Sequence, residues 1–100
     1  MPISQKQKRW LKKQVHHLKP IVTMGQAGLT EAVLKEIEIA LAHHELVKIK
    51  VSADDREQRD TVVQVIAAKT GSDLIDRIGN RASFFRANPE KKKPMELPAE

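Results

Sequence analysis

The sequence predicts a compact α/β sandwich in the order α-β-α-β-α-β-β, with three helices on a small four-stranded mixed sheet. Three segments carry apolar residues at helical spacing, and short segments typical of strands alternate with them and then follow as a pair. A chain of 100 residues, 40% of them hydrophobic, is long enough to bury one modest core. We therefore expect a single domain without internal repeats.

The first helix is expected to begin at Ser4, a capping residue, and to run to about His17. Pro20 disfavours helix at the residue before it, so the helix ends there and Ile21 to Met24 form a brief strand. Residues at i, i+4 and i+7 spacing predict one buried stripe, with Trp10 beside it: Leu11, Val15 and Leu18.

The second helix is expected to follow Thr30, a good N-cap, and to extend to about His43. The next segment, Leu46 to Val51, alternates between apolar and basic residues, which is typical of a half-buried strand. Its apolar side chains should face the core, and Lys48 and Lys50 should face outward.

The third helix is expected to begin at Asp54 or Asp55 and to end at Gly71. A hairpin should follow, with strands Leu74 to Ile78 and Ala82 to Arg86 and a turn at Gly79-Asn80-Arg81. Of the neighbours Phe84 and Phe85, one should be core and the other less buried. Residues 1–86 are assigned to the domain, and residues 87–100, rich in lysine and proline, to a mobile tail.

The positive charge is concentrated in the first part of the chain. Residues 1–30 contain six lysines and arginines and no acidic residue, whereas residues 31–100 contain twelve against thirteen acids. The formal net charge of +5 therefore comes from the first thirty residues. Such a basic segment favours nucleic acid as the partner. A membrane surface is less favoured, because the apolar stripe of the first helix is needed to cover the sheet.

A GxxG sequence, Gly25-Gln26-Ala27-Gly28, separates the first strand from the second helix. Glycine at both ends permits positive φ and lets a sugar-phosphate approach the backbone, and the start of the helix offers unpaired N–H groups at the same place. The alternative is a tight turn that needs glycine for geometry alone. The acid-free basic surroundings favour phosphate contact.

Other chemistries find little support in the sequence. The histidines form two adjacent pairs, His16-His17 and His43-His44, which diverge on a helix and do not predict a metal site. Aromatic residues make up 3% of the chain, too few for a base-stacking platform. The chain has no cysteine and no catalytic motif, so neither an enzyme nor a cofactor is expected. Without a signal peptide or an apolar span, the expected location is cytoplasmic.

Several segments together resemble the CRM domain (chloroplast RNA splicing and ribosome maturation), most closely its stand-alone bacterial YhbY-type form. The resemblance covers about residues 4–86 and is carried by Leu18-Lys19-Pro20, Gly25 to Thr30, Glu36-Ile37-Glu38 and His44 to Val51. It implies an RNA-binding module with a fold like the C-terminal domain of translation initiation factor three. One departure is that Phe85 stands where the family usually has tyrosine, so a hydroxyl is lost, whereas Arg86 is retained.

The resemblance implies a monomeric protein that contacts structured RNA of the large ribosomal subunit, or its precursor particle, and assists its assembly. The residues expected to contact RNA are Gly25, Gln26, Ala27, Gly28, Lys12, Lys13, Lys19, Lys48, Lys50 and Arg86. No metal, small-molecule substrate or membrane contact is expected. The alternative is a protein-interaction module of a ribosome-associated complex, in which GxxG is only a structural turn.

Overall fold

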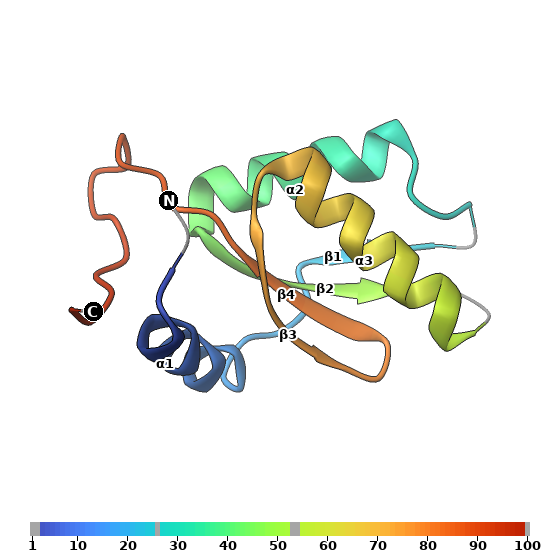
Figure 1. Cartoon of the computed structure of the whole chain (residues 1–100). Helices are drawn as coiled ribbons and strands as arrows, with labels where there is room; N and C mark the ends of the chain where they lie inside the picture. The colour runs from blue at the N-terminus through green and yellow to red at the C-terminus, as the bar shows by residue number, and fades with distance from the viewer. Residues whose placement is uncertain (1–2, 26, 53–54, 100) are drawn as a thin grey trace.

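The computed structural model describes residues 3–25, 27–52 and 55–99. The elements follow in the predicted order: α1 (Gln5–Val15), β1 (Val22–Met24), α2 (Glu31–His44), β2 (Leu46–Val51), α3 (Arg56–Thr70), β3 (Asp73–Ile78) and β4 (Arg81–Phe85). The strands form one mixed sheet in the order β1-β2-β4-β3, with β1 parallel to β2 and the other pairs antiparallel. Helices α2 and α3 lie over one face of the sheet, and α1 lies over part of the other (Figure 1).

The helices begin where their capping residues predict. Ser4 forms a capping box with Gln7, in which each side chain accepts the backbone N–H of the other residue, at 3.1 and 3.0 Å. Thr30 caps α2 and Asp55 caps α3, each accepting the N–H three residues further on. Of the two aspartates expected as candidates for the α3 cap, Asp55 fills the role, and Asp54 lies outside the described residues.

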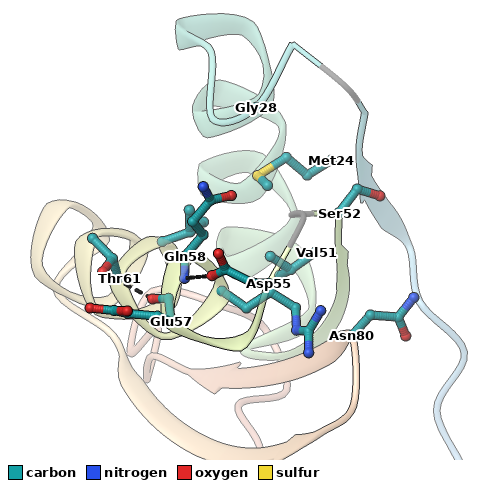
Figure 2. Close-up of a pocket in the computed structure, with 11 residues that line it drawn as sticks. Met24, Gly28, Val51, Ser52, Asp55, Glu57, Gln58, Thr61 and Asn80 are labelled. Carbon is teal, nitrogen blue, oxygen red and sulfur yellow. Dashed lines mark hydrogen bonds between the residues drawn. The ribbon is translucent and has the colours of Figure 1, made fainter.

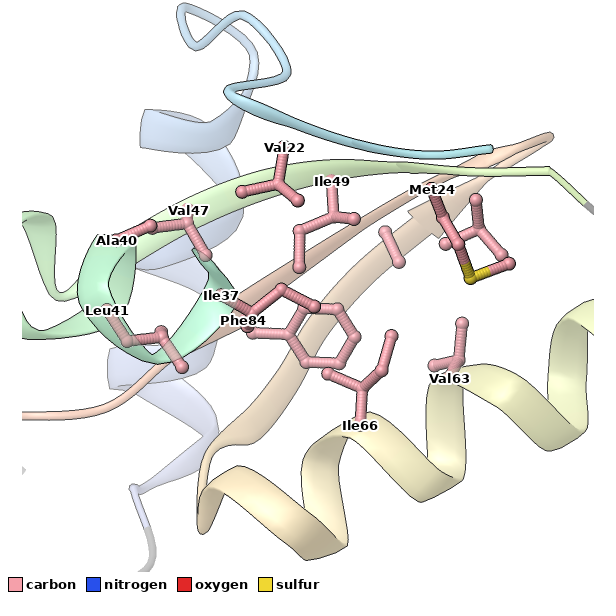
Figure 3. Packing of buried hydrophobic residues seen from close by; sticks show 12 residues of the cluster. Val22, Met24, Ile37, Ala40, Leu41, Val47, Ile49, Val63, Ile66 and Phe84 are labelled. Carbon is pink, nitrogen blue, oxygen red and sulfur yellow. The ribbon is translucent and has the colours of Figure 1, made fainter. Parts of the chain in front are cut away.

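The larger core lies between the sheet and the layer of α2 and α3. The alternation of β2 turns Val47, Ile49 and Val51 toward this layer, as predicted, and Phe84 of β4 joins them (Figure 3). Phe84 is fully buried. Truncating a buried phenylalanine to alanine costs about 3–5 kcal/mol, so this side chain is central to the stability of the domain.

The smaller core lies on the opposite face, under α1. Leu11 and Val15 pack there against Leu46, Ile75 and Phe85. The prediction that one of the two phenylalanines would be less buried is wrong, because Phe85 is only 3% exposed. Neighbouring side chains of a strand point to opposite faces, and here each face is covered by a helix.

The hairpin turn is shorter than predicted. Ile78 lies opposite Arg81, so the loop is the dipeptide Gly79-Asn80, and β4 runs from Arg81 to Phe85 instead of from Ala82 to Arg86. Gly79 has a φ of 59°. Glycine with positive φ at the first central position is typical of a type II′ turn, whose twist suits the two flanking strands.

Residues 87–99, which the sequence assigns to a tail, form no helix or strand, and parts of them contact the domain. Met95 and Leu97 pack against the smaller core. The side chain of Gln7 in α1 donates a hydrogen bond to the carbonyl of Pro98 at 3.0 Å. The physical reason is that α1 leaves part of its apolar surface uncovered, and the two apolar tail residues cover it.

A buried carboxylate also holds the tail. Glu45, at the end of α2, is 1% exposed and has a φ of 62°, a conformation uncommon for any residue but glycine. Its carboxylate accepts the backbone N–H groups of Asn88 at 2.9 Å and Met95 at 2.7 Å, and the ammonium group of Lys91 lies 3.6 Å away. A buried carboxylate is costly without partners, and the tail supplies them.

Candidate nucleic-acid interface

The GxxG loop connects β1 to α2 at the carboxyl end of β1 (Figure 1). The N–H of Gly28 donates to the carbonyl of Gly25 at 3.0 Å, and the N–H of Thr30 donates to the carbonyl of Gly28 at 3.1 Å. Gly25 and Ala27 are exposed, and Gln26 lies outside the described residues. The loop therefore presents backbone to solvent at the end of the sheet.

The two glycines of this loop differ in what the fold requires of them. Gly28 has a φ of 80°, which residues with a side chain rarely adopt. Gly25 has no positive φ, and a Cβ atom placed on it would meet no other heavy atom within 4 Å. A tight turn thus accounts for glycine at position 28 but not at position 25. Close approach of a partner to the backbone would account for both.

An open cleft of about 1130 Å³ lies between the loop and the start of α3 (Figure 2). Its lining comes from four parts of the chain: Met24, Gly28, Val51, Ser52, Asp55, Glu57, Gln58, Arg59, Thr61, Val62 and Asn80. Asp55 and Glu57 place two carboxylates on the α3 side, and that of Asp55 accepts the N–H of Gln58 at 2.8 Å. Arg59 of the same helix also lines the cleft, so its α3 side carries charges of both signs.

The sequence analysis did not assign this cleft. Its residues come from segments up to 56 positions apart, and only the order of the strands brings them together. The hairpin turn reaches it because the N–H of Val51 donates to the carbonyl of Asn80. The GxxG motif was the one signal in the sequence that pointed to this end of the sheet.

The structure places Lys50 beside the strand that leads into the loop. Lys50 is exposed and lies opposite Thr23 of β1 on the face of the sheet that α1 partly covers. Lys48, two residues earlier, shares this face and is half-buried. Arg81 of β4 lies directly opposite Lys50 and is exposed. No ion pair to these three cations is seen within the described part of the chain, and Asp76 lines a small cleft together with Lys48 and Arg81.

The other predicted lysines lie elsewhere. Lys12 and Lys13 are exposed in the last turn of α1, whose residues Leu11 and Val15 face the sheet. Lys19 is exposed in the connection between α1 and β1. The predicted basic residues therefore do not form one compact patch with the GxxG loop: only Lys50, with Lys48 behind it, is placed on the strands next to it.

Arg86 differs from the other predicted contacts, because its guanidinium group is bound within the protein. It donates to the carboxylate of Glu38 at 2.8 Å and to the backbone carbonyl of Thr70 at 2.8 Å. These bonds join the residue after β4 to the middle of α2 and to the last residue of α3, at the end of β4 away from the hairpin turn. We therefore infer that Arg86 stabilises the packing of the helices on the sheet and is not part of the interface.

A metal site and a membrane-spanning helix are two further possibilities for residues 3–25, 27–52 and 55–99. No three side chains of histidine, cysteine, aspartate or glutamate gather closely enough there to hold a metal ion. None of the helices in these ranges has the length and apolar character needed to cross a bilayer.

Fold and site together define a small α/β domain with an accessible glycine loop at one end of its sheet and a basic strand beside it. The family model of the CRS1 / YhbY (CRM) domain matches residues 3–86. The chain therefore belongs to this family.

Individual relatives agree with this assignment. The chain is 44% identical over 96 residues to a Haemophilus influenzae protein named as an RNA-binding protein, which covers 96% of this chain and 95% of the relative. It is 41% identical over 95 residues to a Pseudomonas aeruginosa protein named as a probable RNA-binding protein, covering 95% and 91% of the two chains. The solution structure of a hypothetical protein from Staphylococcus aureus is similar with a TM-score of 0.82 at 29% identity, over 97% of this chain and 100% of that one.

Proposed function

We propose that this protein binds RNA through the GxxG loop and the basic face of the sheet, that its target is structured RNA of the large ribosomal subunit or its precursor, and that it assists assembly of that subunit. The observation that carries the proposal is Gly25, an exposed glycine that neither backbone conformation nor packing within the protein requires. The names of the relatives, which describe RNA binding, support the same class of partner.

The chemistry of the interface follows from its geometry. The loop backbone, without side chains at its two ends, lets a phosphodiester approach the unpaired N–H groups at the start of α2. Lys50 and Arg81 neutralise further phosphates along the adjoining strands. Such contacts hold the sugar-phosphate backbone and depend little on the bases.

The test is equilibrium binding to a panel of large-subunit ribosomal RNA fragments, comparing wild type with Gly25→Asp/Gly28→Asp. Circular dichroism first shows whether both proteins are folded. A matched control, Gln64→Glu/Ala68→Glu, adds the same two negative charges at exposed positions of α3. We expect the loop variant to lose at least about tenfold in affinity and the control to stay within about twofold, because the loop contacts phosphate directly.

Unchanged affinity in the folded loop variant would overturn the proposal for the loop. The GxxG sequence would then be a structural turn, and the protein-interaction module of a ribosome-associated complex would become the better account. An equal loss in the loop variant and the control would show that net charge alone governs binding. Failure of the wild type to bind any fragment above the level of unrelated RNA of equal length would overturn the ribosomal target.

A further inference from the structure

A second cleft, of about 430 Å³, lies at the other end of β2 from the GxxG loop. Strand β1 begins only at Val22, opposite Ile49, so the edge of β2 at Leu46 and Val47 extends beyond it. The cleft lies along this edge and is lined by Leu46 and Val47, whereas the cleft beside the GxxG loop is lined by Val51. The nearest lining residues of the two clefts on β2, Lys48 and Val51, are three positions or about 10 Å apart, and the two linings share no residue, so the clefts are distinct.

The second cleft collects four basic side chains and no acidic one from the described part of the chain: His17, Lys19, His44 and Lys48. They come from the segment after α1, the end of α2 and the middle of β2. In the sequence the histidines are two adjacent pairs, and the structure takes one member of each pair into this cleft. Their neighbours His16 and His43 are not part of its lining.

Between the basic groups the cleft offers an aliphatic surface. Ile21 is 52% exposed, and Leu18 and Met95 lie beside it in the lining. Met95 belongs to the tail and is fixed there because its N–H donates to the buried carboxylate of Glu45 at 2.7 Å. An aliphatic surface bordered by cations suits a nucleotide, because a nucleotide has the flat face of a base close to an anionic phosphate.

We propose that this cleft binds an unpaired nucleotide of the RNA, with the phosphate held by Lys19 and Lys48 and with the rings of His17 and His44 as further contacts. The proposal rests on the RNA-binding function proposed above and adds a second contact site to it. Removal of a ring that lines the cleft should therefore lower the affinity for RNA.

Other charged groups surround the two histidines. The ring of His43 lies 6.4 Å from that of His44, and the carboxylate of Glu45 is turned toward the tail. Lys13 stands one helical turn before His17 in the sequence, and Lys91 lies beside Glu45. His43 and His44 are adjacent and both exposed, but only His44 lines the cleft, which makes them a matched pair.

The experiment compares His44→Gln with His43→Gln. Both residues are exposed in the last turn of α2, so both substitutions remove one imidazole from the same helix end and keep the packing of the core. The probes are the ribosomal RNA fragment that wild type binds most tightly and a six-residue oligouridylate, each measured in 0.1 M salt. We expect the affinity to fall about fivefold in His44→Gln and to stay near that of wild type in His43→Gln, because the loss of one hydrogen-bonding contact weakens binding by about that factor.

Nuclear magnetic resonance supplies a second readout. The ring signals of His17 and His44 should shift when oligouridylate is added, and those of His43 should stay in place. Inorganic phosphate at the same concentration of phosphate groups should produce much smaller shifts. Equal shifts with both probes would overturn the nucleotide and leave a general anion site.

The outcomes separate this proposal from the function on which it rests. If the folded Gly25→Asp/Gly28→Asp variant loses RNA affinity while His44→Gln equals His43→Gln, RNA binding by the loop stands and the second contact site is overturned. If His44→Gln loses affinity and His43→Gln does not, the second site is supported. If wild type binds neither probe, both proposals are overturned.

Discussion

At the scale of single residues, the proposed RNA contact at the GxxG loop depends on the difference between Gly25 and Gly28. Both belong to one short motif, and a sequence pattern cannot distinguish a glycine that shapes a turn from one that leaves room for a partner. The structure distinguishes them through the φ of 80° at Gly28 and the open space around Gly25. A residue whose identity the fold does not require is best explained by something outside the fold.

This difference predicts different effects on stability. Gly28→Ala should lower the free energy of unfolding by about 1–2 kcal/mol, because a side chain is disfavoured in the left-handed region. Gly25→Ala should change it by less than about 0.5 kcal/mol. Thermal unfolding followed by circular dichroism measures both, and equal destabilisation by the two substitutions would show that the turn requires glycine at each end.

A second prediction at this scale concerns Lys50. If Lys50 neutralises one phosphate, Lys50→Gln should weaken RNA binding and reduce the magnitude of the slope of log K against log salt by about 0.7–0.9. Lys69→Gln, an exposed lysine at the end of α3, serves as the control and should keep the wild-type slope. The same loss of slope in both variants would mean that the contact is diffuse and that Lys50 has no particular place in it.

At the scale of elements, local signals predicted most of the fold. The signals that make Ser4 and Thr30 helix caps lie in neighbouring residues of the sequence. The alternation of apolar and basic residues predicted the bounds of β2 correctly. The burial of Phe85 and the position of the tail could not be predicted in this way, because both depend on contacts between segments far apart in the chain. The candidate site divides similarly: the GxxG motif is local, whereas both clefts are assembled by the sheet.

The tail provides a test at the element scale. Deleting residues 88–100 removes two N–H donors from the buried carboxylate of Glu45 and uncovers part of the smaller core. We expect the free energy of unfolding to fall by at least about 2 kcal/mol, measured by urea denaturation. An unchanged midpoint would show that the tail is detached in solution, as the sequence alone suggests.

The same truncated protein also tests where RNA binds. At pH 7.5 and at a temperature where it remains folded, it should keep most of the wild-type RNA affinity, because Lys50 and the GxxG loop lie outside the deleted segment. A large loss of affinity in the folded protein would place the main contact on the tail lysines, Lys91 to Lys93.

At the scale of the whole molecule, the charge is unevenly spread in the sequence and again in space. The acid-free first thirty residues contribute α1, the connection to β1 and the GxxG loop, which lie on one face and at one end of the sheet. The opposite layer, α2 and α3, contains acids that pair with the protein's own arginines, as Asp60 does with Arg77 and Glu38 with Arg86. The acids seen in ion pairs with arginines therefore lie in the layer of α2 and α3, whereas the acid-free segment lies on the other side of the sheet and at one end of it.

This distribution predicts the salt dependence of RNA binding. With about five phosphates engaged, log K should fall against log salt with a slope of about −3.5 to −4.5. Titrations of wild type at several salt concentrations supply the slope. A value near zero would remove the electrostatic basis of the interaction.

The most direct test of the central claim is the affinity of Gly25→Asp for a large-subunit ribosomal RNA fragment, measured beside its thermal stability. We predict that Gly25→Asp keeps the wild-type stability and loses at least about tenfold in affinity for RNA, because the new side chain and its charge would stand where the phosphate approaches. Wild-type affinity in the folded variant would contradict the account and show that RNA does not approach this loop.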